Sequence, residues 1–196
     1  ADSYVQLGQA DRAVQLLLET ESESDNYYID CLKACLVASV RSSGASQSTI
    51  KLVATNLIAS GRLTEGVQLL CLINKGLDAC RYLQTYGAWD HAVWLAKASL
   101  ESSDCAEVLK RWAEHLSSPQ VNQKSRSVLV LLSLGQFYKV LEVLYSMRNF
   151  DRATLFLEAC LEFRVLKYSE TTGSLFEAIY LEYARYLINL GLCQAA

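Results

Sequence analysis

Apolar residues recur along this chain three and four positions apart, which is the spacing of one face of an α-helix. The pattern is complete in 104–116, where every third or fourth residue is apolar. No segment alternates apolar and polar residues as a half-buried β-strand would. The pattern therefore predicts an all-α protein. Helical stripes of this kind also occur in 27–40, 50–59, 63–73, 77–86 and from 174 to about 190.

Polar stretches rich in serine and asparagine separate these stripes and predict the connections, because such side chains compete with helical hydrogen bonding. A capping-box spacing of Ser174 and Glu177 predicts the start of the last helix. The predicted connections are 19–26, 41–49, 117–127 and 168–174.

A short phrase recurs in the sequence: a glycine, followed five residues later by a small or β-branched apolar residue that opens an apolar run. Glycine can end a helix in the left-handed conformation, and a small residue lets the next helix approach closely. Repetition of such corners predicts an α-solenoid of stacked antiparallel helix pairs, with 1–196 as a single segment. The glycine spacings are irregular, so we expect an irregular TPR-like or coatomer-like stack. The phrase occurs at Gly8, Gly61, Gly87 and Gly135, begins again over Gly191–Ala196, and has a copy without glycine at 148–153.

Composition adds limits to this prediction. The 196 residues are 52% hydrophobic and include one proline, Pro119, which favours uninterrupted helices. No apolar run approaches the roughly 18 residues of a membrane span, so we expect no direct membrane insertion. The first residues lack the basic and apolar regions of a signal peptide. Because Ala1 and Ala196 fall close to predicted helix corners, we expect a fragment of a longer chain.

The net charge of −3 gives little electrostatic support for a nucleic-acid partner. Acidic residues concentrate in 1–30 and basic residues in the later half, which either steers a partner or reflects solvated helix faces. The three tryptophans and eleven tyrosines are not interleaved with lysine and arginine, so helix packing explains them better than base stacking.

The sequence predicts no catalytic residue, no metal site and no cofactor. Seven cysteines without a CxxC motif are typical of reduced thiols packed as small hydrophobes in a cytosol-facing protein. Both histidines, His91 and His115, follow an acidic residue, but adjacent helical residues point about 100° apart and form no relay. A nucleophile elbow and a phosphate loop are absent. An enzyme would need a pocket in which one histidine meets a cysteine or carboxylate.

The last predicted helix carries apolar residues on more than one face, which is typical of a helix covered by neighbours. One stripe includes Phe176, Ile179 and Leu187, while Leu181 and Ile188 lie on other faces. We therefore expect an interface at this end, with core packing as the alternative explanation of its tyrosines. The candidate interface residues are Tyr180, Leu181, Tyr183, Tyr186 and Ile188.

Four stretches resemble the C-terminal helical region of the WD repeat-containing protein 11 family, and the resemblance covers most of the chain from about residue 25. The most specific fragments are RYLQTYG within 78–100 and SSPQVNQKS within 109–137. The other two stretches are 44–75 and 146–163, and departures concentrate in 164–174 and beyond 190.

The resemblance implies a large cytosolic protein in which N-terminal WD40 β-propellers precede an α-solenoid. It implies a non-catalytic interaction scaffold of a trans-Golgi network complex that captures endosome-derived vesicles brought in by golgins. Partners would be other subunits of that tethering complex or a second copy of the chain. An alternative is an oligomerisation module of a WD-repeat protein in ciliary signalling, with locations at the cilium base and nucleus. The family supplies no catalytic motif to transfer.

Overall fold

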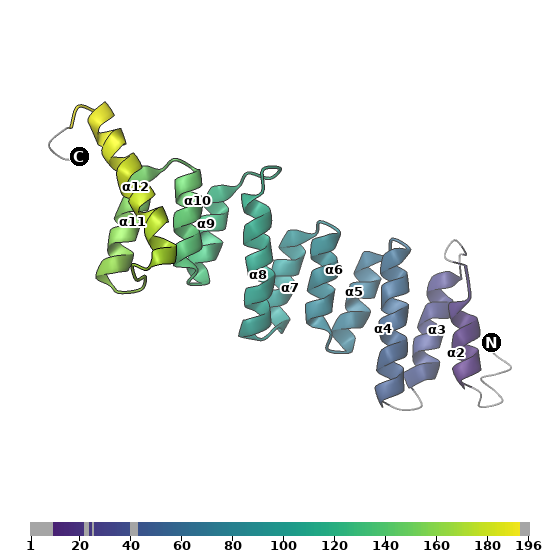
Figure 1. Cartoon of the computed structure of the whole chain (residues 1–196). Helices are drawn as coiled ribbons and strands as arrows, with labels where there is room; N and C mark the ends of the chain where they lie inside the picture. Colours follow the sequence, from purple (N-terminus) through teal and green to yellow (C-terminus); the bar gives the residue numbers. More distant parts are fainter. Residues whose placement is uncertain (1–9, 22–23, 25, 40–42, 193–196) are drawn as a thin grey trace. The chain divides into compact units, whose positions relative to one another are not determined.

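The computed structural model describes residues 10–21, 24, 26–39 and 43–192, and these residues are helical with short connections and no strand. The all-α prediction is therefore confirmed (Figure 1). The helices are α2 (Ala10–Leu18), α3 (Tyr27–Ser39), α4 (Ser43–Ala59), α5 (Leu63–Leu72), α6 (Gly76–Thr85), α7 (Trp89–Ser99), α8 (Ser102–Ser117), α9 (Lys124–Ser133), α10 (Phe137–Ser146), α11 (Phe150–Glu162) and α12 (Glu170–Asn189).

The chain divides into two compact units, 1–108 and 109–196, with the boundary inside α8. In the first unit α2 to α7 pack in chain order, each helix on the next, as Figure 1 shows. In the second unit α9 to α12 do the same. Each unit therefore has the helix-on-helix arrangement that the sequence predicts. The expectation that 1–196 forms one solenoid segment stays a prediction.

Each unit buries its own apolar core. The first unit has one cluster around Leu57 on α3 and α4, and a second that runs from Ala54 to Val108. The second unit packs Leu141, Leu157 and Phe176 into a single cluster, and all three side chains are fully buried. The apolar stripes that the sequence predicts thus form the buried clusters, because each helix packs its stripe against those of its neighbours.

Within the described residues, seven helix corners share one hydrogen-bond pattern, which we call the Schellman corner. A left-handed residue donates its N–H to the carbonyl three residues back, and the next residue donates to the carbonyl five residues back. At Gly61, for example, φ is +88° and the acceptors are the Ile58 and Leu57 carbonyls, at 3.1 and 2.9 Å. The seven corner residues are Gly61, Asn74, Gly87, Gly135, Arg148, Arg164 and Gly191.

The sequence identified the corners at Gly61, Gly87, Gly135 and Gly191 and the degenerate corner at Arg148, while its corner at Gly8 lies outside the described residues. It missed that Asn74 and Arg164 have the same left-handed geometry, with φ of 57° and 56°. Asparagine adopts this conformation more readily than most residues, but arginine has no such preference. The conformation follows from the packing of the helices on either side.

At five of these corners, a small or β-branched residue five positions after the corner residue is buried, as the phrase predicts; at the Arg164 corner the equivalent residue, Ser169, is exposed, and at the Gly191 corner it lies outside the described residues. Gly66 shows the reason most directly: a Cβ built there would lie 2.4 Å from Ile58 Cγ1 and 2.6 Å from the Ala54 carbonyl oxygen. The backbones of α4 and α5 therefore approach to a distance that admits no side chain at this point. The equivalent buried residues at other corners are Ala79, Ala92, Val140 and Ala153.

Three predicted connections are shorter in the structure. Residues 43–49 belong to α4 and 124–127 to α9, because helix packing overrides the local preference of their serines. The last helix is capped by Ser169, whose side chain and that of Thr172 form the reciprocal capping box. The prediction of a cap at Ser174 is wrong, and Glu177 instead accepts a hydrogen bond from the Tyr168 hydroxyl.

Candidate protein-interaction surface

The candidate interface lies on α12, which is much longer than the helix it packs on. It has 20 residues, whereas α11 has 13. At 1.5 Å per residue, α12 is about 10 Å longer. Because the two helices run antiparallel, the C-terminal part of α12 continues past the start of α11, as Figure 1 shows.

The core-facing side of α12 is well defined. Phe176 and Ile179 are completely buried, and Leu187 is 9% exposed. Leu181 and Ile188 lie on the opposite side and are each 53% exposed. Seven residues correspond to nearly two full turns, so these two side chains share one outer stripe. The structure therefore brings together two of the five candidate residues.

The three tyrosines do not belong to that outer stripe. Tyr183 is half-buried on the core side, and Tyr180 and Tyr186 are 38% and 46% exposed. Six helical steps place Tyr180 and Tyr186 about 120° apart, so they flank the core-facing side on its two edges. Burial, with a smaller contribution from the nearby Glu158 carboxylate, raises the pKa of the Tyr180 phenol. The five residues thus divide among an outer stripe, two separate edges and, for Tyr183, the core side.

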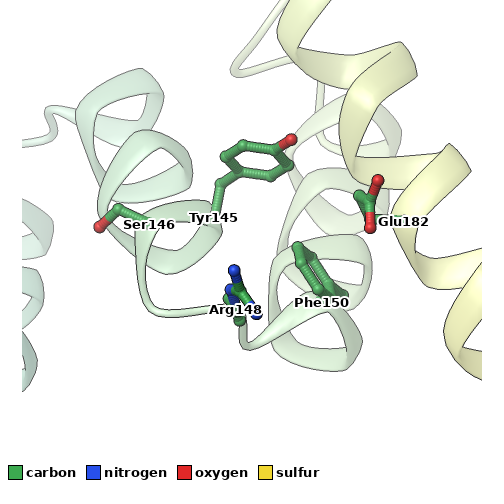
Figure 2. A pocket seen from close by; sticks show the side chains of 5 residues that line it. All are labelled: Tyr145, Ser146, Arg148, Phe150 and Glu182. Atoms are coloured by element: carbon green, nitrogen blue, oxygen red, sulfur yellow. The ribbon is translucent and has the colours of Figure 1, made fainter.

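A hollow of about 450 Å³ lies beside this helix, between α12 and the corner that joins α10 to α11. Figure 2 shows Tyr145, Ser146, Arg148 and Phe150 arranged around it, with Glu182 of α12 across from them. The Tyr145 and Phe150 rings meet edge to face, with centroids 5.7 Å apart. Glu182 accepts a 2.6 Å hydrogen bond from Arg185. The hollow therefore combines aromatic walls with one base and one acid.

Sequence reasoning did not single out this hollow. It noticed the Arg148 corner, where the left-handed residue is not a glycine. The sequence does not show that the rings of Tyr145 and Phe150, on either side of that corner, contact each other and lie opposite Glu182. Aromatic residues that flank a helix corner lacking glycine were the only available signal.

The two histidines tested for catalysis lie on different helices and in different units. His91 is exposed on α7, with its ring 6.0 Å from that of Trp94. His115 is half-buried near the end of α8. In the part of the chain that the structure describes, no group of three or more His, Cys, Asp or Glu could hold a metal ion.

The six described cysteines are unpaired thiols, four of them buried. Burial is the main cause that raises the pKa of both Cys35 and Cys80 from 9.0 to about 11. Such thiols are poor nucleophiles near neutral pH, because the thiolate is the reactive form. Cys193 lies outside the described residues. Among the helices described, none is long and apolar enough to cross a bilayer.

Comparisons with known proteins agree with this architecture. A family model described as "WDR11 TPR domain" matches residues 2–186. WD repeat-containing protein 11 of Mus musculus is 65% identical over 195 residues, and that of Homo sapiens is 64% identical over 195. The protein of that name in Danio rerio is 62% identical over 196 residues. These matches cover 100% of this chain and 16% of each relative. The chain therefore belongs to the WD repeat-containing protein 11 family, in the region of its TPR domain.

Proposed function

We propose that this chain is a protein-interaction scaffold that contributes to the capture of endosome-derived vesicles at the trans-Golgi network. The TPR-like fold and the family support the scaffold role. The trans-Golgi role, the golgin-delivered vesicles and the partner subunits come from the family resemblance of the sequence. Because the chain spans 16% of its relatives, the proposal concerns the contribution of this segment to a longer protein.

The observation that carries the scaffold proposal is the set of large apolar side chains that α12 leaves on the surface of the second unit. Leu181 and Tyr186 are 53% and 46% exposed, and the mixed aromatic and charged hollow lies along the same helix. Interfaces concentrate their binding energy in a few such anchors, with tyrosine and arginine enriched among them. The stack of helices holds these anchors in fixed positions, so little conformational entropy is lost on binding.

The test uses the full-length protein in cells that lack their own copy. Leu181→Asp combined with Tyr186→Ser removes two apolar anchors without changing a buried residue. We expect the variant to fold and to lose most capture of endosome-derived vesicles at the trans-Golgi network. Leu36→Asp is the matched control, because Leu36 is 67% exposed on α3 in the other unit.

Undiminished vesicle capture by the folded double variant would contradict the use of this surface. Sedimentation of the purified protein addresses the alternative role in assembly. Concentration-dependent self-association that the double variant abolishes, with vesicle capture intact, would favour an oligomerisation module.

A further inference from the structure

Tyr168 lies in the connection between α11 and α12, at a point where the chain is neither helical nor in a turn. Its side chain is 62% exposed. The other tyrosines that the structure describes belong to helices or, for Tyr86, to the end of α6. The next residue, Ser169, has extended backbone, with φ −143° and ψ 166°. Tyr168 is therefore the described tyrosine that an enzyme can reach without unwinding a helix.

Although most of its side chain is exposed, Tyr168 is held against α12 by two contacts. Its hydroxyl donates a hydrogen bond to the Glu177 carboxylate. Its ring meets that of Phe176 edge to face, with centroids 6.0 Å apart. Phe176 is completely buried in the apolar cluster of the second unit. Tyr168 thus packs the connection against a central core residue.

The end of the tyrosine ring lies directly on the backbone of α12 at Gly173. A Cβ built there would lie 2.9 Å from both the Cζ and Oη atoms of Tyr168. Ordinary contacts between non-bonded carbon atoms are about 3.5–4.0 Å long, so a side chain at this position would push the ring away. The lack of a side chain at Gly173 therefore lets the hydroxyl reach Glu177. A larger group on Oη would meet the α12 backbone on one side and the Glu177 carboxylate in front.

The surroundings of the Tyr168 hydroxyl also disfavour negative charge. The hydrogen bond to Glu177 is the main cause that raises the pKa of the Tyr168 phenol, and burial and the negative charge of the carboxylate add to it. A phosphate group carries about −1.5 to −2 charges at neutral pH, and its dianion has no hydrogen to donate to Glu177. The contact therefore suits the neutral phenol and does not suit its phosphate ester.

We propose that Tyr168 is a site of tyrosine phosphorylation and that this modification releases residues 167–169 from α12. A protein tyrosine kinase transfers the γ-phosphoryl group of ATP to the phenolic oxygen, which loses its proton, and ADP is the other product. The phosphate and the Glu177 carboxylate then repel each other, and the contact breaks. Phe176 loses the ring that packs on its edge, so the first turns of α12 loosen. This inference does not depend on the vesicle-capture role.

The first test identifies the acceptor in the purified full-length protein, incubated with MgATP and a constitutively active cytosolic tyrosine kinase. Phosphopeptide mass spectrometry should show at least tenfold higher occupancy at Tyr168 than at Tyr186, which is 46% exposed but lies inside α12. A synthetic peptide of residues 163–175, in which Tyr168 is the one tyrosine, serves as the reference substrate and should also be phosphorylated.

The second test measures amide hydrogen exchange with and without kinase treatment. Exchange in 165–177 should become at least fivefold faster on phosphorylation, and exchange in 10–108 should not change. Tyr168→Phe controls for phosphate at other tyrosines, and kinase treatment should leave its exchange unaltered. Glu177→Gln is the matched variant, because its amide oxygen still accepts the hydroxyl hydrogen bond but carries no charge that repels a phosphate. Phosphorylated Glu177→Gln should therefore exchange at a rate close to that of its unphosphorylated form.

Phosphate at Tyr186 or another tyrosine without phosphate at Tyr168 would overturn the site, and so would a reference peptide that the kinase does not accept. Exchange in 165–177 that stays constant on phosphorylation, or that rises equally in Glu177→Gln, would overturn the release of the connection.

Discussion

Where α4 and α5 approach most closely, at Gly66, there is no room for even one added methyl group. Gly66 faces the Ala54 carbonyl oxygen, a backbone atom that cannot move without displacing α4. Gly76 has a similar first contact, 2.9 Å from a built Cβ, but its neighbour is the terminal Cδ2 of Leu100. A flexible side-chain end can rotate away, whereas a helix backbone cannot.

Gly66→Ala is therefore expected to destabilise the protein. The alanine adds about 1 kcal/mol of helix propensity, but overpacking costs about 1–3 kcal/mol, and the rigid neighbour makes the cost prevail. Gly76→Ala, the matched control, should be neutral or slightly stabilising. Urea unfolding followed by circular dichroism measures both. A lower urea midpoint for Gly76→Ala than for Gly66→Ala would show that the α4–α5 contact is not the limiting one.

At the scale of the elements, the feature that repeats along the chain is the helix corner rather than the helix interior. Asn74, Arg148 and Arg164 adopt the left-handed conformation that glycine occupies at the other corners. For a residue with a Cβ, that conformation is unfavourable by roughly 1–2 kcal/mol. The flanking helices hold these residues there, because both corner hydrogen bonds form in the same way as at the glycines.

Arg164→Gly is accordingly expected to stabilise the protein by about 0.5–1 kcal/mol, since the relief of left-handed strain exceeds the extra entropy of an unfolded glycine. Arg111→Gly provides the control: Arg111 is also exposed, but it lies inside α8. That change should destabilise by about 1 kcal/mol. Thermal unfolding of the two variants should thus shift in opposite directions, and a parallel loss of stability would rule out strain at the corner.

At the scale of the whole molecule, two separate sets of apolar side chains stabilise the two units. Leu57 is completely buried in a cluster of the first unit and Leu157 in the cluster of the second. In stacked helical proteins each helix pair gains stability mainly from its nearest neighbours. A cavity in one unit should therefore act locally.

Leu57→Ala and Leu157→Ala are each expected to cost about 2–5 kcal/mol in their own unit. Native-state hydrogen exchange, resolved by peptide, should show lost protection in 10–108 for the first variant and in 109–192 for the second. Equal loss of protection across both units from either variant would mean that the chain unfolds as one cooperative block.

The sequence alone determined the class of structure and most of the corners. Helical apolar periodicity identifies the stripes that form the core, and a glycine followed five residues later by a small or β-branched residue marks the corners at Gly61, Gly87 and Gly135, because both signals are local. The local signals also failed in a consistent way. Residues 43–49 became helical despite their serines, and Asn74 and Arg164 adopted left-handed corners without being glycines.

Only the tertiary structure decided how the candidate surface is divided. The sequence grouped Tyr180, Leu181, Tyr183, Tyr186 and Ile188 because they share one helix, and that grouping stays a prediction as an interface. Their separation into an outer stripe, two edges and the core side depends on which side of α12 meets α11 and on how far α12 extends beyond it. The hollow at Tyr145 and Phe150 arises in the same way. Such features are set by contacts between different helices, which no pattern within a single helix encodes.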